Sequence, residues 1–191
     1  MEQDWPAWAT EAVEVVPPDP AWPALAAALR RRLTPVLGPW LVGGIEHVGS
    51  TAVAGLAAKP IVDLLAPVER LAAADDVAPA LPRPQPWHST PRADEGWALV
   101  PPDLDGRPWR RLFVLPSGAR RLAHLHLVAG DDPHVAELLA FRDALRGDAE
   151  LAAAYATHKR SAATDHRGDR EAYTAAKTAF VLGVLAQHRT R

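Results

Sequence analysis

The sequence contains no cysteine, which excludes disulfide bonds, thiolate metal sites and cysteine nucleophiles. It also lacks any run of about 18 apolar residues, so we expect no membrane-spanning helix. The first residues are acidic and do not show the charged-then-apolar pattern of a signal peptide. We therefore expect a cytoplasmic protein.

Neither sign of charge is in large excess. The chain has 21 Lys and Arg against 23 Asp and Glu, a formal net charge of -2, and a pI near 6.4. This balance provides no general attraction to nucleic acid or to an anionic membrane, and we expect neither as a partner. An anionic substrate would have to be held by a local cluster of positive groups.

Lysine is scarce, because only Lys59, Lys159 and Lys177 accompany the arginines. Arginine presents a planar fork of donors, whereas lysine carries a compact charge on a flexible stem. Each retained lysine therefore reflects either chance on a solvated helix face or a place where a compact ammonium group is needed.

What the chain does have is enough apolar material for a core: 48% of its 191 residues are hydrophobic. That length suits one domain. We expect a single domain over residues 1–191, with a loose N-terminal arm over residues 1–18 and a helical C-terminal part over residues 132–191.

A helix is predicted from Asp19-Pro20, where Asp is a good N-cap and Pro a good first residue. Trp22, Leu25, Leu29 and Leu33 then form one apolar stripe, and Gly38-Pro39 ends the helix. A further helical patch is predicted over residues 68–78. The proline-crowded residues 79–95 predict an irregular loop, which we interpret as a flap over the site.

Short apolar stretches bounded by turn residues predict strands, the last three of them joined as a meander. They are Ile45–Val48, Ile61–Leu65, Trp97–Val100, Trp109–Leu115 and Leu122–Val128. From Asp132 onward the apolar spacing becomes helical, and Asp169 is the expected N-cap of the last of three helices. The fold class is therefore α+β: a mixed sheet flanked by helices, with a helical C-terminal third.

Two features near the first strands suggest phosphate chemistry. Gly49-Ser50-Thr51 follows a strand, where glycine allows close backbone approach and the hydroxyl and N–H groups can bind phosphate, although the same residues also form ordinary turns. Asp63 lies 13 residues after Ser50, within an apolar strand, and a buried carboxylate needs a metal, a cation or donors. Lys59 either pairs with Asp63 in a structural bridge or binds phosphate.

His124-Leu125-His126 is the second constellation. Strand alternation places both imidazoles on one face, which offers two metal ligands, whereas two core histidines would each need a separate hydrogen-bond partner. His47 joins them if its strand is adjacent. Asp63 would then complete a His/Asp site for a divalent ion.

Arginine pairs flank the predicted hairpin, and alternation allows one member of each pair to face a phosphate and the other solvent, with a solvated surface as the alternative for each arginine. The pairs are Arg110-Arg111 and Arg120-Arg121. On the following helix, Arg142 either forms an ion pair with Asp143 or reaches the site.

Taken in order, these residues resemble the GrpB family, which is assigned to the nucleotidyltransferase superfamily, over roughly residues 13–185. The resemblance is carried by Pro20-Ala21-Trp22, Glu46 to Val53, Gly55 to Pro60, Asp63, Arg110-Arg111, Phe113, His124-Leu125-His126, Phe141-Arg142-Asp143, Leu145-Arg146, Tyr155, Lys159, Tyr173 and Lys177. All three lysines fall on family-pattern positions, which favours the functional interpretation of each.

The resemblance implies a Gly-Ser motif followed by a strand with two metal-binding carboxylates two residues apart, which hold two Mg²⁺ ions. Asp63 fits the first carboxylate, but Leu65 stands at the second. Either the ion arrangement differs here, or the protein binds a phosphorylated ligand without transferring a nucleotide.

We therefore predict a metal-assisted, nucleotidyltransferase-type enzyme that acts on a nucleoside triphosphate and a small acceptor. The alternatives are a metal-dependent hydrolase with a His/Asp site and a non-catalytic nucleotide- or phosphate-binding module. The expected cofactor is a divalent metal (Mg²⁺, Mn²⁺ or Zn²⁺), and the expected partner is a nucleotide or other phosphorylated small molecule. The predicted residues are Asp63, His124 and His126 for catalysis; Gly49, Ser50, Thr51, Lys59, Arg110, Arg111, Lys159 and Lys177 for phosphate; and His47, Asp63, His124 and His126 for metal.

Overall fold

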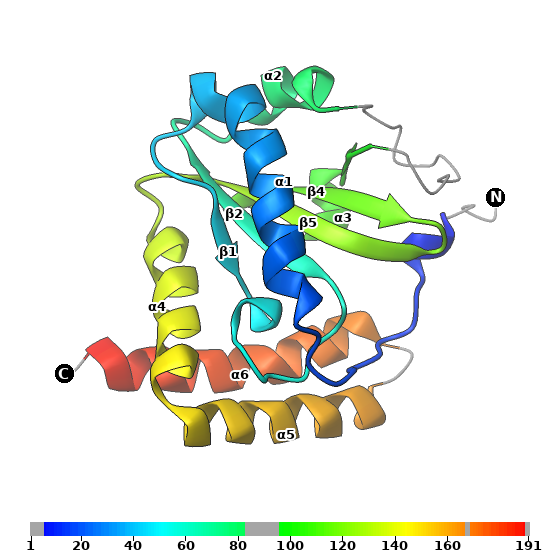
Figure 1. Cartoon of the computed structure of the whole chain (residues 1–191), viewed down its shortest axis with the longest axis vertical. Coiled ribbons are helices and arrows are strands. Elements are labelled where there is room, and N and C mark those ends of the chain that lie inside the picture. The colour runs from blue at the N-terminus through cyan, green and yellow to red at the C-terminus, as the bar shows by residue number, and fades with distance from the viewer. Residues whose placement is uncertain (1–5, 83–95, 167–168, 190–191) are drawn as a thin grey trace.

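The computed structural model describes residues 6–82, 96–166 and 169–189. One five-stranded sheet lies at its centre, in the order β1-β2-β5-β4-β3 (Figure 1). The β2–β5 pair is parallel and the other neighbours are antiparallel, so the sheet is mixed. The strands are β1 (Glu46–Val48), β2 (Val62–Val68), β3 (Ala98–Leu99), β4 (Arg110–Ser117) and β5 (Arg120–Ala129).

Helices surround this sheet and make up the C-terminal part of the chain (Figure 1). They are α1 (Ala21–Leu37), α2 (Ala73–Ala80), α3 (Pro102–Asp105), α4 (Pro133–Gly147), α5 (Ala149–Asp165) and α6 (Arg170–Arg189). The predicted α+β class, with its mixed sheet and helical C-terminal third, is confirmed. Within the described ranges, no helix is long and apolar enough to cross a membrane. Residues 83–95 of the predicted flap lie outside the described part.

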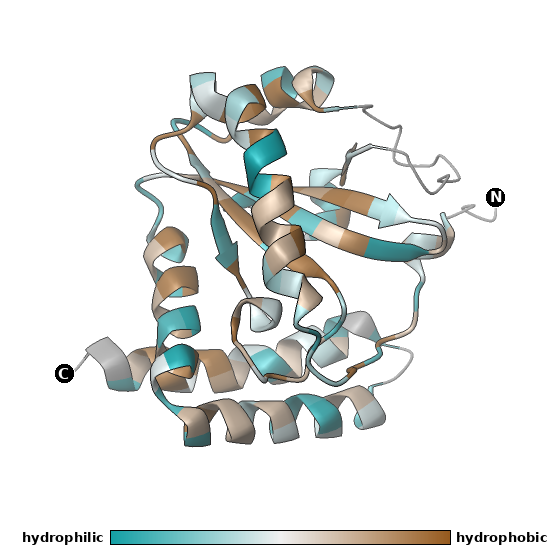
Figure 2. Cartoon of the chain, viewed as in Figure 1, coloured by the Kyte–Doolittle hydropathy of each residue, from teal (hydrophilic) through white to brown (hydrophobic). Residues whose placement is uncertain are grey.

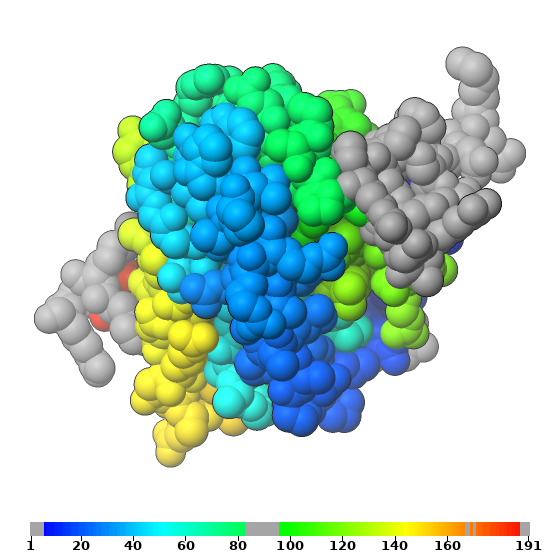
Figure 3. Space-filling model, turned by 45° about the horizontal axis from the view of Figure 1, so that its top comes forward, coloured from blue at the N-terminus to red at the C-terminus, as the bar shows by residue number. Residues whose placement is uncertain are grey.

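Helix α1 covers one face of the sheet (Figures 1 and 2). The Asp19 carboxylate accepts a hydrogen bond from the Ala21 N–H at 2.8 Å, as expected of a residue at the helix start. The predicted stripe is buried at Trp22, Leu29 and Leu33. It packs on the residues of β2 and β5 that alternation turns to this side: Val62, Leu64, Ala66, Val68, Ala123, Leu125 and Leu127. In the space-filling view, α1 lies across the face seen, with α4 beside it (Figure 3).

Helix α4 covers part of the opposite face. Its Val135, Leu138 and Leu139 pack on Val48 and on two further buried strand residues, Leu65 and Val128. Leu65 is fully buried, so the position where a second metal-binding carboxylate would stand is used for packing.

The described part of the N-terminal arm is packed rather than loose, so that expectation was wrong. Trp8 is 1% exposed and lies against Ala98, Val100, Leu112 and Val114.

Arg121 holds this arm in place, because its guanidinium donates to the carbonyl oxygens of Trp8 and Ala9 at 2.9 and 3.2 Å. Arg120 forms an exposed ion pair with Glu14 of the same arm at 3.3 Å. The Arg120-Arg121 pair therefore anchors the arm, and neither residue joins the site described below.

The helical C-terminal part packs beneath the segment that follows β1. Asp169 caps α6 as predicted, accepting from the N–H groups of Glu171 and Ala172 at 3.0 and 2.9 Å. A small apolar cluster then joins α4 and α5 to Val53 and Leu56 through Leu145, Tyr155 and Ala156. Helices α4 and α5 therefore pack against the residues that directly follow the Gly49-Ser50-Thr51 turn.

Candidate active site

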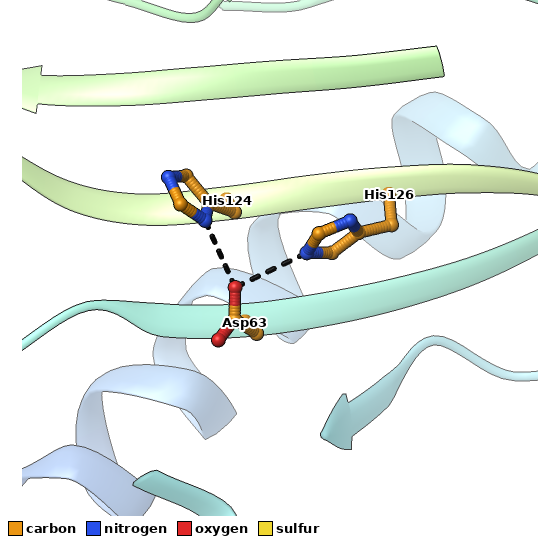
Figure 4. A group of neighbouring side chains, drawn as sticks. All are labelled: Asp63, His124 and His126. Carbon is orange, nitrogen blue, oxygen red and sulfur yellow. Dashed lines mark hydrogen bonds and ion pairs between the residues drawn. The ribbon is translucent and has the colours of Figure 1, made fainter. Parts of the chain in front are cut away.

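Asp63, His124 and His126 meet on the sheet face that α1 does not cover (Figure 4). Asp63 of β2 pairs in register with His124 of the parallel strand β5. Its Oδ1 lies 2.9 Å from His124 Nδ1 and 3.1 Å from His126 Nε2. As strand alternation predicts, both rings share a face, and one ligand atom from each of the three residues lies within 4.8 Å of the others.

The three residues determine one another's charge. Burial by itself would raise the pKa of Asp63, but the hydrogen bonds from His124 and His126 outweigh it and hold that pKa well below its usual range. Burial lowers the pKa of His124 to about 4, although Asp63 opposes the shift. Burial, followed by the charge of Arg110, also lowers the pKa of His126. Near neutral pH the site therefore holds an ionised carboxylate and two neutral imidazoles.

Gly49 lies directly against the other oxygen of Asp63. Its φ is 71°, a conformation that side chains rarely adopt, and a Cβ at this position would lie 2.6 Å from Asp63 Oδ2. Only glycine fits here. The turn Ser50–Ala52 follows at once, so the predicted phosphate-binding turn and the predicted metal-binding carboxylate are neighbours in space.

Side chains from the C-terminal helices brace this turn. Arg142 donates to Glu46 Oε2 at 2.9 Å and to the His47 carbonyl at 3.2 Å, so it binds β1 just before the turn as well as Asp143. Arg146 donates to the Ala52 carbonyl at 3.0 Å.

Burial raises the pKa of the Tyr155 hydroxyl of α5 well above its usual range, and the neighbouring Ser50 side chain opposes that shift. Helix α4 thus holds both the strand before the turn and the Ala52 end of the turn, and Tyr155 of α5 lies beside its serine.

His47 and Thr51 do not join the Asp63 cluster. His47 pairs with Leu64 in the β1–β2 ladder, so its side chain shares the face of Leu64 rather than that of Asp63. Its Nε2 lies 3.0 Å from Thr51 Oγ1, and that hydroxyl donates to the Ile61 carbonyl at 3.2 Å. Burial lowers the pKa of His47 to about 4, so His47 acts as a neutral, buried partner of Thr51.

The Arg110-Arg111 pair divides between the two faces of the sheet, as predicted. Arg110 donates to His126 Nδ1 at 2.7 Å and makes a two-pronged ion pair with Asp105, at 2.6 and 2.8 Å. Arg111 pairs with Leu127, on the α1 side, and donates to the Arg110 carbonyl. Only Arg110 of this pair reaches the cluster, and it does so through His126.

The three lysines of the chain converge on its two tyrosines. Lys159 is 2% exposed, donates to the Ala57 carbonyl, and lies 4.7 Å from the centre of the Tyr155 ring. Burial, assisted by Lys177 and Arg160, lowers the pKa of Lys159 to about 7. Lys59 and Lys177 each lie 4.5 Å from the centre of the Tyr173 ring. Since Tyr155 also contacts Ser50, this positive cluster adjoins the turn.

Sequence reasoning missed two contributors. Asp105 looks like an ordinary turn residue, and nothing in its neighbourhood indicates that it would bind the arginine of an adjacent strand. Arg146 matched the family pattern without a role, because a bond to the Ala52 carbonyl depends on how α4 packs.

A mixed sheet that carries one carboxylate, two histidine donors and an abutting glycine turn defines an α+β protein with a His–Asp site on its helix-poor face. A family model described as GrpB protein matches residues 12–187. The chain therefore belongs to the GrpB family.

Individual relatives agree with this family. The UPF0157 protein PA4798 of Pseudomonas aeruginosa is 36% identical and is aligned over 97% of this chain and 71% of its own length. A dephospho-CoA kinase of Mycolicibacterium paratuberculosis is 35% identical over 86% of this chain, which spans only 43% of that enzyme. The crystal structure of conserved protein GrpB from Enterococcus faecalis has a TM-score of 0.70 at 24% identity, covering 92% of this chain and 99% of that one. That structure supports the shared fold.

Proposed function

We propose that this protein is a nucleotidyltransferase-type enzyme that binds a nucleoside triphosphate with a divalent ion and transfers the nucleotide to a small acceptor. The observation that carries the proposal is the contact between Gly49 and Asp63 Oδ2. It brings a turn suited to phosphate directly beside a carboxylate suited to a metal ion.

The charge state of Asp63 supports a metal-binding role. Its Oδ1 already accepts two N–H groups, from His124 and His126, so Oδ2 is the oxygen left for an ion. Mg²⁺ and Mn²⁺ suit this arrangement, because Mg²⁺ is commonly bound through one carboxylate, with substrate phosphates and water completing its shell. A bound ion would neutralise charge on the phosphates as the leaving group departs. The side chain of Asp63 is 29% exposed, so an ion can reach it.

The chain's own residues would hold the remainder of the triphosphate. The N–H groups and the Ser50 hydroxyl at the Gly49-Ser50 turn are suited to phosphate oxygens. Lys59 and Lys177, beside the Tyr173 ring, would supply positive charge, whereas Lys159 is buried on the Ala57 carbonyl with its pKa lowered to about 7.

In the transfer, an acceptor oxygen would attack the α-phosphorus. The bond from that phosphorus to the bridging oxygen of pyrophosphate would break, and the acceptor proton would pass to water.

A second candidate is a metal-dependent hydrolase, favoured by the three ligand atoms within 4.8 Å of one another. It predicts one tightly bound transition metal per chain in the purified protein. Elemental analysis separates the two candidates, because the proposed transferase carries no such resident ion.

The test is a nucleotide screen of the purified protein. Thermal unfolding and pyrophosphate release would be measured with ATP, GTP, CTP and UTP, in Mg²⁺ or Mn²⁺. We expect saturable stabilisation by at least one nucleotide, lost in Asp63→Asn and kept in Asp76→Asn, whose carboxylate is exposed on α2 in an ion pair with Arg70. No stabilisation and no turnover with any of the four nucleotides would refute the proposal.

A further inference from the structure

Arg110 lies between two acceptors, and its position determines where His126 carries its proton. The guanidinium binds both carboxylate oxygens of Asp105 and places Nη1 2.7 Å from His126 Nδ1. A guanidinium is a donor only and is not deprotonated in proteins. His126 Nδ1 must therefore accept, so it carries no proton.

The consequence falls on the other ring nitrogen. A neutral imidazole has one N–H, so the proton of His126 is on Nε2, which donates it to Asp63 Oδ1 at 3.1 Å. An Nε2 that carries a proton has no lone pair for a metal ion. Moving the proton to Nδ1 would point an N–H at the Arg110 guanidinium, with two donors 2.7 Å apart.

His124 also directs an N–H group at Asp63 Oδ1, but through its other ring nitrogen. Its Nδ1 lies 2.9 Å from Asp63 Oδ1, which can only accept, so Nδ1 carries the proton. Its Nε2 is buried and has no hydrogen-bond partner among the described residues. Both rings thus present N–H groups to one oxygen, although their geometry would otherwise suit a transition metal.

Histidines that bind metals have the reverse arrangement. The nitrogen away from the metal normally donates to a carboxylate or a carbonyl, which leaves the other nitrogen free to coordinate. Asp105 is such a carboxylate close to His126, but Arg110 stands between them, with only 11% of its side chain exposed. The Asp105–Arg110 ion pair therefore presents a donor to His126, where a metal-binding histidine would normally meet an acceptor.

We propose that Arg110 is a positioning residue that withholds His126 from metal ions, so that the site rejects nitrogen-preferring ions such as Zn²⁺ and Co²⁺ and keeps Asp63 Oδ2 for an oxygen-coordinated ion. The inference rests on the proposed function only in assigning an Mg²⁺-type ion to Asp63. Metal binding in the absence of nucleotide tests the role of Arg110 separately. That experiment can therefore be interpreted even if the nucleotide screen fails.

The first experiment titrates Co²⁺ into the nucleotide-free protein and follows the visible absorption of the ion together with the heat of binding. In Arg110→Gln, the amide oxygen can accept from His126 Nδ1–H, which frees Nε2. We expect this variant to bind Co²⁺ about 10–100-fold more tightly than the wild type, the usual size of an outer-shell effect. Arg111→Gln is the matched control, because Arg111 lies on the other face and should leave binding unchanged.

The increase in Co²⁺ affinity of Arg110→Gln must depend on His126. Adding His126→Ala to Arg110→Gln should return Co²⁺ binding to the wild-type level. Equal affinity in Arg110→Gln and Arg111→Gln would overturn the proposal, as would a gain that survives the loss of His126.

A second measurement needs no variant and so does not depend on Arg110→Gln folding. Long-range proton–nitrogen NMR of the wild type reads the tautomer of each histidine directly. The expected spectrum shows a proton on His126 Nε2 and none on Nδ1. A proton on Nδ1 would overturn the proposal.

Discussion

The two faces of the sheet are built from alternate residues of the same strands, yet they have opposite chemistry. On the α1 face, β2 and β5 present only buried apolar side chains, among them Leu64 and Leu125. On the other face the same strands present Asp63, His124 and His126. Packing of the apolar face fixes the two strands against each other, so that three polar groups on the reverse face can meet within hydrogen-bonding distance.

The largest expected effect comes from the apolar face. Leu125 is fully buried at the centre of the sheet, so Leu125→Ala should lower the free energy of unfolding by about 2–5 kcal/mol. Urea denaturation measures this loss. Large-to-small core substitutions of leucine cost more than about 1 kcal/mol. A smaller loss would contradict the claim that the apolar face stabilises the sheet.

The next effect concerns His47, the buried histidine on the apolar face. Its pKa is lowered to about 4 in the folded protein, so the unfolded chain takes up a proton first as the pH falls. Stability is therefore lost below the unfolded pKa of about 6.5, and His47 should account for about 2 kcal/mol between about pH 7 and pH 5. Urea denaturation at both pH values should show this part of the loss missing in His47→Gln. An identical pH dependence in both proteins would contradict the assignment.

A smaller effect compares two glycines with the same backbone conformation. Gly49 and Gly55 have φ values of 71° and 75°, but only Gly49 has Asp63 in the way of a side chain. Gly55→Ala should cost about 1–2 kcal/mol from backbone strain alone. Gly49→Ala should cost clearly more, because the new methyl group must displace Asp63. Equal losses in thermal unfolding would show that the close approach of Gly49 to Asp63 is not present in solution.

The last effect separates the two arginines of β4. Arg111→Gln should change the free energy of unfolding by no more than about 0.5 kcal/mol, as surface substitutions usually do. Arg110→Gln should cost about 1–3 kcal/mol, because it removes the two-pronged partner of the buried Asp105 carboxylate and leaves it with the ion pair to Arg107 at 3.7 Å. Chemical denaturation of the two variants, side by side, checks the difference. A larger loss of unfolding free energy in Arg111→Gln than in Arg110→Gln would contradict the assignment of Arg110 to the face that carries the site.

Local patterns in the sequence predicted much of this fold. The Trp22 stripe, the alternation at His124 and His126, and the Asp169 cap each depend on residues close together in the chain, and each was confirmed. The N-terminal arm was misjudged because Trp8 packs on strands β3 and β4 and its carbonyl binds Arg121, all about a hundred residues away in the chain.

The site was predictable only in part, for the same reason. Asp63 and the two histidines could be paired because alternation fixes which face each one occupies. His47 was not separable from them in sequence, since the register of β1 against β2 decides its face. The link from Asp105 through Arg110 to His126 depends on where α3 sits beside β4, which no local pattern encodes.

The most direct test of the account is the position of a metal ion in crystals grown with Mn²⁺ and a non-hydrolysable nucleoside triphosphate. We predict an anomalous peak about 2.0–2.3 Å from Asp63 Oδ2, with phosphate oxygens completing the coordination. An ion bound instead among Asp63 Oδ1, His124 Nδ1 and His126 Nε2, or nucleotide bound away from Asp63, would contradict it.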